Sequence, residues 1–228
     1  MPTGSSPAAS VAPVAWRRLL EAAVAHAGPA DTRLQALDAR RARHAARPAA
    51  VLIGVEAASE PRIYFTQRTQ GLTHHPGQIS FPGGRIDPGD SSPADAALRE
   101  CHEEIGLARE AVTLLGGLPC YRTVTGFEIK PFVGWIEPGQ MLQPDGVEIE
   151  RIFAVPLAYA MDSAHYRSEE RRRDDVCYRV YSIDFEGHHI WGATAAMLME
   201  LAQRVARAAG RPFFVADVAG ISDQNGRF

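Results

Sequence analysis

The sequence is poor in cysteine and has no long apolar run, and both features narrow the class of protein. Its 228 residues include three cysteines, which form no Cys-x-x-Cys pair and no zinc-ligand spacing: Cys101, Cys120 and Cys177. This usage predicts a reducing compartment without a disulfide framework. No apolar run approaches the ~18 residues of a membrane-spanning helix. The first residues lack the basic start and apolar centre of a signal peptide. We therefore expect a cytoplasmic protein with no membrane partner.

The chain also lacks an excess of charge of either sign. Its formal net charge is −3, with 46% apolar and 22% charged residues, which is ordinary for a globular domain. This balance gives no electrostatic reason to expect nucleic acid as a partner. An anionic substrate would need a local basic patch or a metal ion. The length suits one sizeable domain with extensions.

The stretch from Phe81 to Leu107, FPGGRIDPGDSSPADAALRECHEEIGL, joins a Gly-rich turn to a short helix. Ser92 suits the N-cap position, and Pro93 suits the first helical position, where its missing N–H costs nothing. Asp95, three residues after Ser92, makes a weaker version of a capping box. A glycine, Gly106, is a natural helix stop. These signals predict a helix of about three turns.

The two faces of this helix differ in chemistry. Apolar residues fall on one arc: Ala94, Ala97, Leu98, Cys101 and Ile105. We expect Glu100, Glu103 and Glu104 on another arc, since positions three and four apart are neighbours. Each like-charge pair costs roughly 0.2–0.5 kcal/mol, which a divalent cation would offset. A Glu-Glu pair alone is usually a solvated face, but here a Gly-rich turn precedes it, and Arg99 lies beside it and could orient a carboxylate.

The spacing of these residues resembles the signature of the Nudix hydrolase family. Gly84 and Asp90 precede the core of the signature, which is Arg99-Glu100, Glu103-Glu104 and Gly106. Asp90 stands where the family usually has Glu, and eight residues rather than seven separate it from Arg99. Strands on both sides of the acidic helix predict an α+β domain. The resemblance implies the Nudix fold, an α/β/α sandwich around a mixed β-sheet.

A second resemblance lies just upstream, in RTQGLTHHPGQISFPGG. It is similar to the extra motif of the coenzyme A pyrophosphatase branch, through these residues: Arg68, Thr69, Leu72, His75, Gly77, Gln78 and Phe81 to Gly84. Thr73 stands where that branch often has a second Arg, which removes a candidate phosphate contact. The resemblance implies that Arg68, Thr69, His75 and Gln78 bind substrate. The alternative is that Arg68 braces the fold through a carboxylate.

The resemblance also implies roles for the acidic residues. Glu100 and Glu104 would be ligands of Mg²⁺ or Mn²⁺, and Glu103 would be a third ligand or a base. Either Glu103 or a neighbouring glutamate, such as Glu100, would take the proton of the attacking water. Gly83 or Gly84 would offer a carbonyl. Glu148 resembles the further acidic ligand that Nudix enzymes recruit from beyond the box. Glu148 and Glu150 precede an apolar run, so we expect both on one face of a strand.

The rest of the chain divides around this motif. Residues 1–12 are rich in Ala, Ser and Pro and predict a disordered tail. We expect a helical extension over residues 13–48, the Nudix domain over 49–209, and a C-terminal extension of unassigned role over 210–228. The charged run Ser168–Asp175 predicts a solvated turn. The alternating run Val176–Phe185 predicts a strand, and Gly192–Ala209 a helix.

The resulting hypothesis is a metal-dependent hydrolase acting on a small molecule. Its substrate would be coenzyme A or a derivative, cleaved at the diphosphate to 3′,5′-ADP and 4′-phosphopantetheine. Two alternatives stay open: another nucleoside diphosphate derivative, such as ADP-ribose or a dinucleotide, and a non-catalytic nucleotide sensor. The intact acidic helix disfavours a sensor, which has no need of every carboxylate. The sequence leaves the oligomeric state open, with a homodimer compatible.

Overall fold

The protein is described by a computed structural model that covers residues 12–25, 46–71, 76–123, 125–173, 176–217 and 222–223. The expected tail over residues 1–12 lies almost entirely outside these ranges, as does most of the expected helical extension. His75, expected to bind substrate, also lies outside them. No helix within the described ranges is both long and apolar enough to cross a bilayer.

The larger sheet is built around one central strand, β1 (Arg47–Glu56). Over its whole length β1 pairs in parallel with β7 (Phe127–Ile136). Its other edge pairs antiparallel with β4 (Gly83–Arg85) at the start and β2 (Arg62–Arg68) at the end. The remaining strands extend this mixed sheet: β3 (Ile79–Ser80), β5 (Val112–Gly117), β6 (Tyr121–Arg122) and β8 (Ile149–Pro156).

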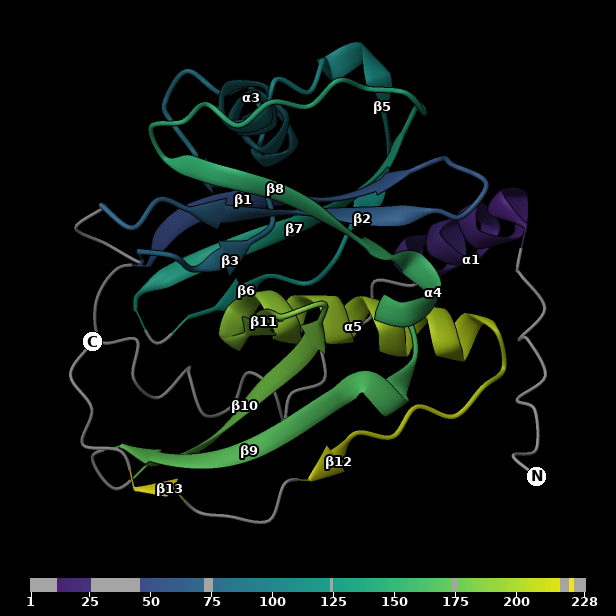
Figure 1. The fold of residues 1–228 in the computed structure, drawn as a ribbon, viewed down its shortest axis with the longest axis vertical. Coiled ribbons are helices and arrows are strands. Elements are labelled where there is room, and N and C mark those ends of the chain that lie inside the picture. The colour runs from purple at the N-terminus through teal and green to yellow at the C-terminus, as the bar shows by residue number, and fades with distance from the viewer. Residues whose placement is uncertain are drawn as a thin grey trace.

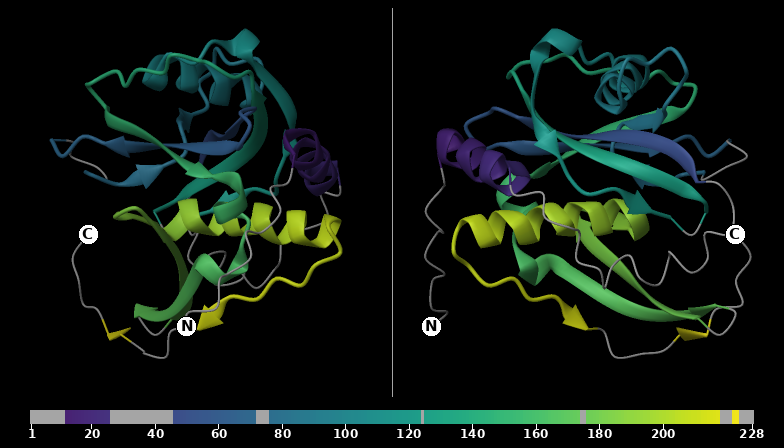
Figure 2. Two further views of the ribbon diagram at one scale, coloured as in Figure 1. Left: turned by 45° about the vertical axis from the view of Figure 1, so that its right-hand side comes forward. Right: turned by 180° about the vertical axis from the view of Figure 1, so that it is seen from behind.

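Helices cover both faces of this sheet (Figures 1 and 2). One face carries α3 (Pro93–Ile105), and the other carries α1 (Pro13–Ala25), α4 (Leu157–Ala160) and α5 (Gly192–Ala208). Side chains alternate along β1, so Leu52 packs with Leu98 and Cys101 of α3, while Ile53 packs on the opposite side. The expected α+β class, with helices on both sides of a mixed sheet, is confirmed.

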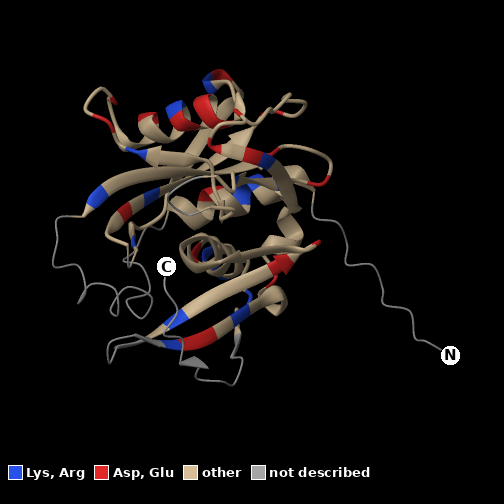
Figure 3. Ribbon diagram, turned by 60° about the vertical axis from the view of Figure 1, so that its left-hand side comes forward, with Lys and Arg blue, Asp and Glu red and all other residues tan. Residues whose placement is uncertain are grey.

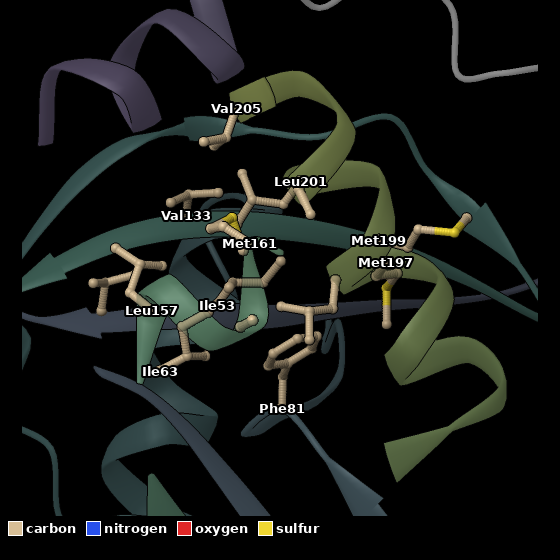
Figure 4. Close-up of a cluster of buried hydrophobic side chains, with 14 of the residues drawn as sticks. Ile53, Ile63, Phe81, Val133, Leu157, Met161, Met197, Met199, Leu201 and Val205 are labelled. Atoms are coloured by element: carbon tan, nitrogen blue, oxygen red, sulfur yellow. The ribbon is translucent and has the colours of Figure 1, made fainter. Parts of the chain in front are cut away.

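The main core lies between the sheet and α5. Figure 4 shows apolar side chains from the strands, α4 and α5 meeting there: Ile53, Ile63, Phe81, Val133, Leu157, Met161, Met197, Met199, Leu201 and Val205. The Thr194 hydroxyl donates to the carbonyl of Ile79 at 3.0 Å, which ties the start of α5 to β3. This core therefore fixes the strands that lead into the acidic helix.

A second sheet lies beyond α5, and the sequence predicted only part of it. It contains β9 (Tyr166–Arg173), β10 (Val176–Phe185) and β11 (His188–Trp191), with β12 (Ala216–Asp217) and β13 (Ser222–Asp223) added along β9. The prediction of a solvated turn over Ser168–Asp175 is therefore wrong up to Arg173. Tyr166 and Ser168 are buried on one side of β9, and pairing with β10 outweighs the charge of the run. The short pairings of β12 and β13 place part of the C-terminal extension against β9.

Most other elements follow the sequence pattern. A helix at the start of the expected extension, the strand Val176–Phe185 and the long helix from Gly192 are all confirmed. The strand β1 begins at Arg47, two residues before the start that we expect for the Nudix domain. Pairing of Arg47 and Pro48 with β7 draws the strand two residues earlier than its apolar run suggests.

Candidate metal and diphosphate site

The helix that carries the acidic residues, α3, is capped at both ends as expected. The Ser92 hydroxyl accepts a hydrogen bond from the Asp95 N–H at 3.1 Å, and Pro93 begins the helix. Gly106 ends it in a left-handed conformation, with φ of 69°. The capping box is not reciprocal, because the Asp95 carboxylate accepts from the backbone N–H and hydroxyl of Ser91 rather than from Ser92.

The three glutamates of α3 differ in their exposure to solvent, which their spacing on the helix does not predict. Glu104 is buried, with 7% of its surface exposed, whereas the Glu103 side chain is 56% exposed. Glu100 lies between these extremes at 19%. The divergence follows from the packing of α3 over β1 and β4, which covers the side of the helix nearest Glu104. Figure 3 shows the acidic and basic residues interspersed along α3.

Glu104 and Glu100 both point at the Gly-rich strand β4. One oxygen of the Glu104 carboxylate accepts the Gly83 N–H at 3.0 Å. The Glu100 carboxylate lies against Gly84, where an added Cβ would sit 2.5 Å from the carboxylate carbon. Gly83 has φ of 146°, and a Cβ there would lie 2.4 Å from the carbonyl oxygen of Ala50. The backbone conformation of Gly83 requires glycine, and the missing side chain of Gly84 leaves room for the Glu100 carboxylate.

Arg99 connects the carboxylates around the start of α3. Its Nε and Nη2 donate hydrogen bonds to the two carboxylate oxygens of Asp90, at 2.8 and 3.1 Å. Its Nη1 donates to Glu103 at 2.9 Å and to Glu100 at 3.2 Å. The expected charge-assisted hydrogen bonds from Arg99 are confirmed. From the sequence, Asp90 stands out only as a departure from the family pattern; in the structure both of its carboxylate oxygens accept hydrogen bonds from Arg99.

Burial and neighbouring charge shift the pKa values of these groups in opposite directions. Burial raises the pKa of Glu104 to about 8, and the nearby Glu100 adds to the shift, while the Gly83 N–H opposes it. Burial also raises the pKa of Glu100, against the opposing effect of Arg99. The hydrogen bonds from Arg99 lower the pKa of Asp90. A carboxylate with a raised pKa gains most from a cation beside it.

The other described residues predicted to bind substrate or metal lie beside α3. We call this group, Arg68, Thr69, Gln78 and Glu148, the rim. Arg68 binds the carboxylate of Glu148 through Nη2 at 3.0 Å. The Thr69 hydroxyl donates to the carbonyl of Val147 at 3.1 Å, and the Gln78 carbonyl accepts the Arg68 N–H. The expectation that Glu148 and Glu150 share a strand face is wrong. Glu148 precedes β8, and the pairing of β2 with β8 shifts register at Glu150.

Glu100 and Glu104 fit a hard divalent cation through the chemistry of their donors. Mg²⁺ commonly takes one or two carboxylates and completes its shell with water and substrate phosphate. Among the residues that the structure describes, no three His, Cys, Asp or Glu side chains gather closely enough to enclose an ion. In this structure Glu103 forms an ion pair with Arg99, and Glu148 forms one with Arg68. Their roles as ligands, and that of the Gly83 carbonyl, stay predictions.

One residue near the site was missed. Asp145 donates its N–H to the Glu104 carbonyl at 3.0 Å and accepts hydrogen bonds from the backbone that follows it. The signal that could have revealed it is the Asp145-Gly146 dipeptide, which marks a turn just before Glu148.

Comparison with known proteins matches this chain to one family. The model for the NUDIX domain matches residues 45–176. A relative from Enterobacter sp. (strain 638), described as an uncharacterized Nudix hydrolase NudL, is 36% identical over 159 residues, covering 70% of this chain and 83% of that relative. A relative of the same description from Salmonella newport (strain SL254) is 39% identical with the same coverage.

Solved structures resemble the chain more weakly. A C. elegans Ap4A hydrolase in a binary complex has a TM-score of 0.43 and 21% identity, covering 50% of this chain and 83% of that one. A Nudix hydrolase from M. Smegmatis, RenU, has a TM-score of 0.44 and 17% identity, covering 75% and 90%. Likenesses of this size say nothing about the substrate.

We predict that Gly84→Ala damages the cation site without unfolding the protein. The new Cβ would displace the Glu100 carboxylate, which is the free end of a flexible side chain, so the melting temperature should change little. Affinity for Mn²⁺, measured by calorimetry, should fall at least about tenfold, as for other changes that misplace a ligand. Gly89→Ala is the matched control, because a Cβ at Gly89 meets nothing within 4 Å. Equal Mn²⁺ affinity in both variants would exclude Glu100 from the site.

The raised pKa of Glu104 predicts a pH dependence of stability in the metal-free protein. A carboxyl whose pKa is higher in the folded state stabilises the fold fully below its ordinary pKa of 4.5, and this contribution is lost as the pH rises toward about 8. In EDTA, the decline of the melting temperature over this range should be smaller in Glu104→Gln than in the wild type. The control is Glu103→Gln, whose exposed side chain should leave the decline unchanged. Identical pH profiles for wild type and Glu104→Gln would contradict the assignment.

Proposed function

This chain belongs to the Nudix hydrolase family, and we propose that it cleaves the diphosphate of coenzyme A or its derivatives. The products would be 3′,5′-ADP and 4′-phosphopantetheine. The observation that carries the proposal is the convergence of Glu104 and Glu100 on the Gly-rich strand that follows the coenzyme A-type motif. That motif ends in the same residues, Phe81 to Gly84, that position the two carboxylates.

The acidic residues would hold Mg²⁺ or Mn²⁺, as Nudix hydrolases generally use divalent metals. A cation bound by Glu100 and Glu104 supplies charge neutralisation for the diphosphate and a lowered pKa for the attacking water. Phosphoryl transfer depends mainly on such positioning and electrostatic stabilisation. Glu103 is exposed beside them and forms an ion pair with Arg99, and we propose it as a further ligand or as the base.

The substrate specificity must come from groups outside α3, since its carboxylates treat any diphosphate alike. Arg68 is the leading candidate, because a guanidinium can bind a phosphate through two hydrogen bonds. It lies close enough to Glu104 to lower the pKa of that carboxyl. Thr69, His75 and Gln78 complete the proposed substrate-binding set. The ion pair of Arg68 with Glu148 also supports the alternative, in which Arg68 braces the rim.

A substrate panel tests the proposal. With Mg²⁺ present, mass spectrometry should detect 3′,5′-ADP and 4′-phosphopantetheine from coenzyme A, at a higher kcat/KM than for ADP-ribose or dinucleotides. EDTA should abolish turnover, and Glu104→Gln should lower kcat at least about a hundredfold, because loss of metal-based stabilisation costs several kcal/mol. Turnover after exhaustive chelation would defeat the metal assignment. Preference for ADP-ribose would assign the chain to another Nudix substrate, and no turnover of any substrate would favour a sensor.

Arg68→Ala separates the two roles of the arginine. If Arg68 reads the substrate, kcat/KM should fall far more for coenzyme A than for ADP-ribose, with little change in melting temperature. Equal losses on both substrates, or a large drop in melting temperature, would favour the bracing role. The matched variant is Glu148→Gln, which removes the charge of the ion-pair partner of Arg68 and leaves Arg68 in place.

A further inference from the structure

The bend over residues 145–149 is tied to two separate parts of the proposed site. At its start, the Asp145 N–H donates to the carbonyl of Glu104 at 3.0 Å. Further along, the Glu148 carbonyl accepts the Thr69 N–H at 2.9 Å, and the Val147 carbonyl accepts the Thr69 hydroxyl at 3.1 Å. The bend therefore bridges the last turn of α3 and the end of β2.

The side chain of Asp145 determines the shape of this bend. Its Oδ1 accepts three backbone hydrogen bonds, from the N–H groups of Val147 at 3.1 Å, Glu148 at 3.1 Å and Ile149 at 2.8 Å. Gly146 takes φ of 71°, which lets the chain turn around the carboxylate. Since β8 begins only at Ile149, Glu148 belongs to no helix or strand, and these bonds hold its backbone.

Glu148 is the side chain that the bend presents to the site. Its carboxylate binds Arg68 at 3.0 Å and lies near enough to Glu100 and Glu104 to act on both electrostatically. A small displacement of its backbone would change both interactions at once. Residues 145–148 are exposed, so Glu148 is restrained by hydrogen bonds rather than by packing: those from Asp145, those with Thr69 and its ion pair with Arg68.

We propose that Asp145 is a positioning residue, whose hydrogen bonds to the backbone hold Glu148 at the rim so that it can reach the bound cation. Asp145 itself touches neither substrate nor metal. The inference rests on the proposed metal site, but it does not depend on coenzyme A being the substrate. It concerns the acceptor oxygen of Asp145 rather than its charge, and the two can be separated by substitution.

The test compares two variants of Asp145 by Mn²⁺ titration calorimetry without substrate. Asp145→Ala removes the acceptor and should weaken Mn²⁺ binding at least about tenfold, as is typical for residues that support a ligand. Asp145→Asn keeps the Oδ1 acceptor and should bind Mn²⁺ within about threefold of the wild type. Asp162→Ala is the matched control, because Asp162 caps the turn Ser163–His165, away from the site, through the Ala164 N–H at 3.0 Å. Equal losses in Asp145→Asn and Asp145→Ala would overturn the proposal.

A double-mutant cycle with Glu148→Ala distinguishes positioning from a general structural role. If Asp145 acts through Glu148, adding Asp145→Ala to Glu148→Ala should weaken Mn²⁺ binding no further. Additive losses would show that Asp145 acts by another route and would contradict the inference. If the wild type binds no Mn²⁺, both the metal site and this inference fail. Failure of coenzyme A as substrate, with these Mn²⁺ results unchanged, would leave the inference standing.

Discussion

The burial of Glu104 against the backbone of Gly83 is the contact on which the candidate site depends. Removing a carboxylate from water costs free energy unless the group is hydrogen-bonded and paired with a positive charge. One oxygen of Glu104 accepts a hydrogen bond from the Gly83 N–H, and Gly83 lies on β4, which approaches β1 closely. Because a Cβ at Gly83 would collide with the Ala50 carbonyl, that approach needs glycine. In the metal-free protein this one hydrogen bond does not offset the cost of burying the charged carboxylate, so the pKa of Glu104 is raised.

The charges around Glu104 are arranged in two groups with different functions. Arg99 gathers Asp90, Glu100 and Glu103 at the start and middle of α3 and relieves the repulsion that their spacing would otherwise create. Arg68 and Glu148 form a separate pair at the rim, held by β2 and by the bend over residues 145–149. The first group organises the carboxylates of the helix, and the second is the pair for which we propose contact with the substrate and the cation.

The sequence predicted local features well where a single segment carried the signal. The caps at Ser92 and Gly106 depend on neighbouring residues, and these were readable from the sequence. The burial of Glu104 was not, because helical spacing gives an angle around α3 but does not say which side β4 covers. The strand β9 was missed for a related reason. Its charged residues predict a solvated turn, and only pairing with β10 and burial of Tyr166 and Ser168 make it a strand. The Asp145 side chain bonds to the backbone, and the only sequence signal of these hydrogen bonds is the turn dipeptide Asp145-Gly146.

The most direct measurement of the central claim is the number of protons released when Mn²⁺ binds. Near pH 7, a carboxyl with a pKa of about 8 is mostly protonated, so a cation that binds Glu104 must displace close to one proton. Calorimetric titrations in buffers of different ionisation enthalpy give this number directly. We expect wild type to release close to one proton per Mn²⁺ at pH 7, falling toward zero above about pH 9, and Glu104→Gln to bind more weakly with no release. Mn²⁺ binding of equal affinity and equal proton release in the two proteins would contradict a site built on Glu104.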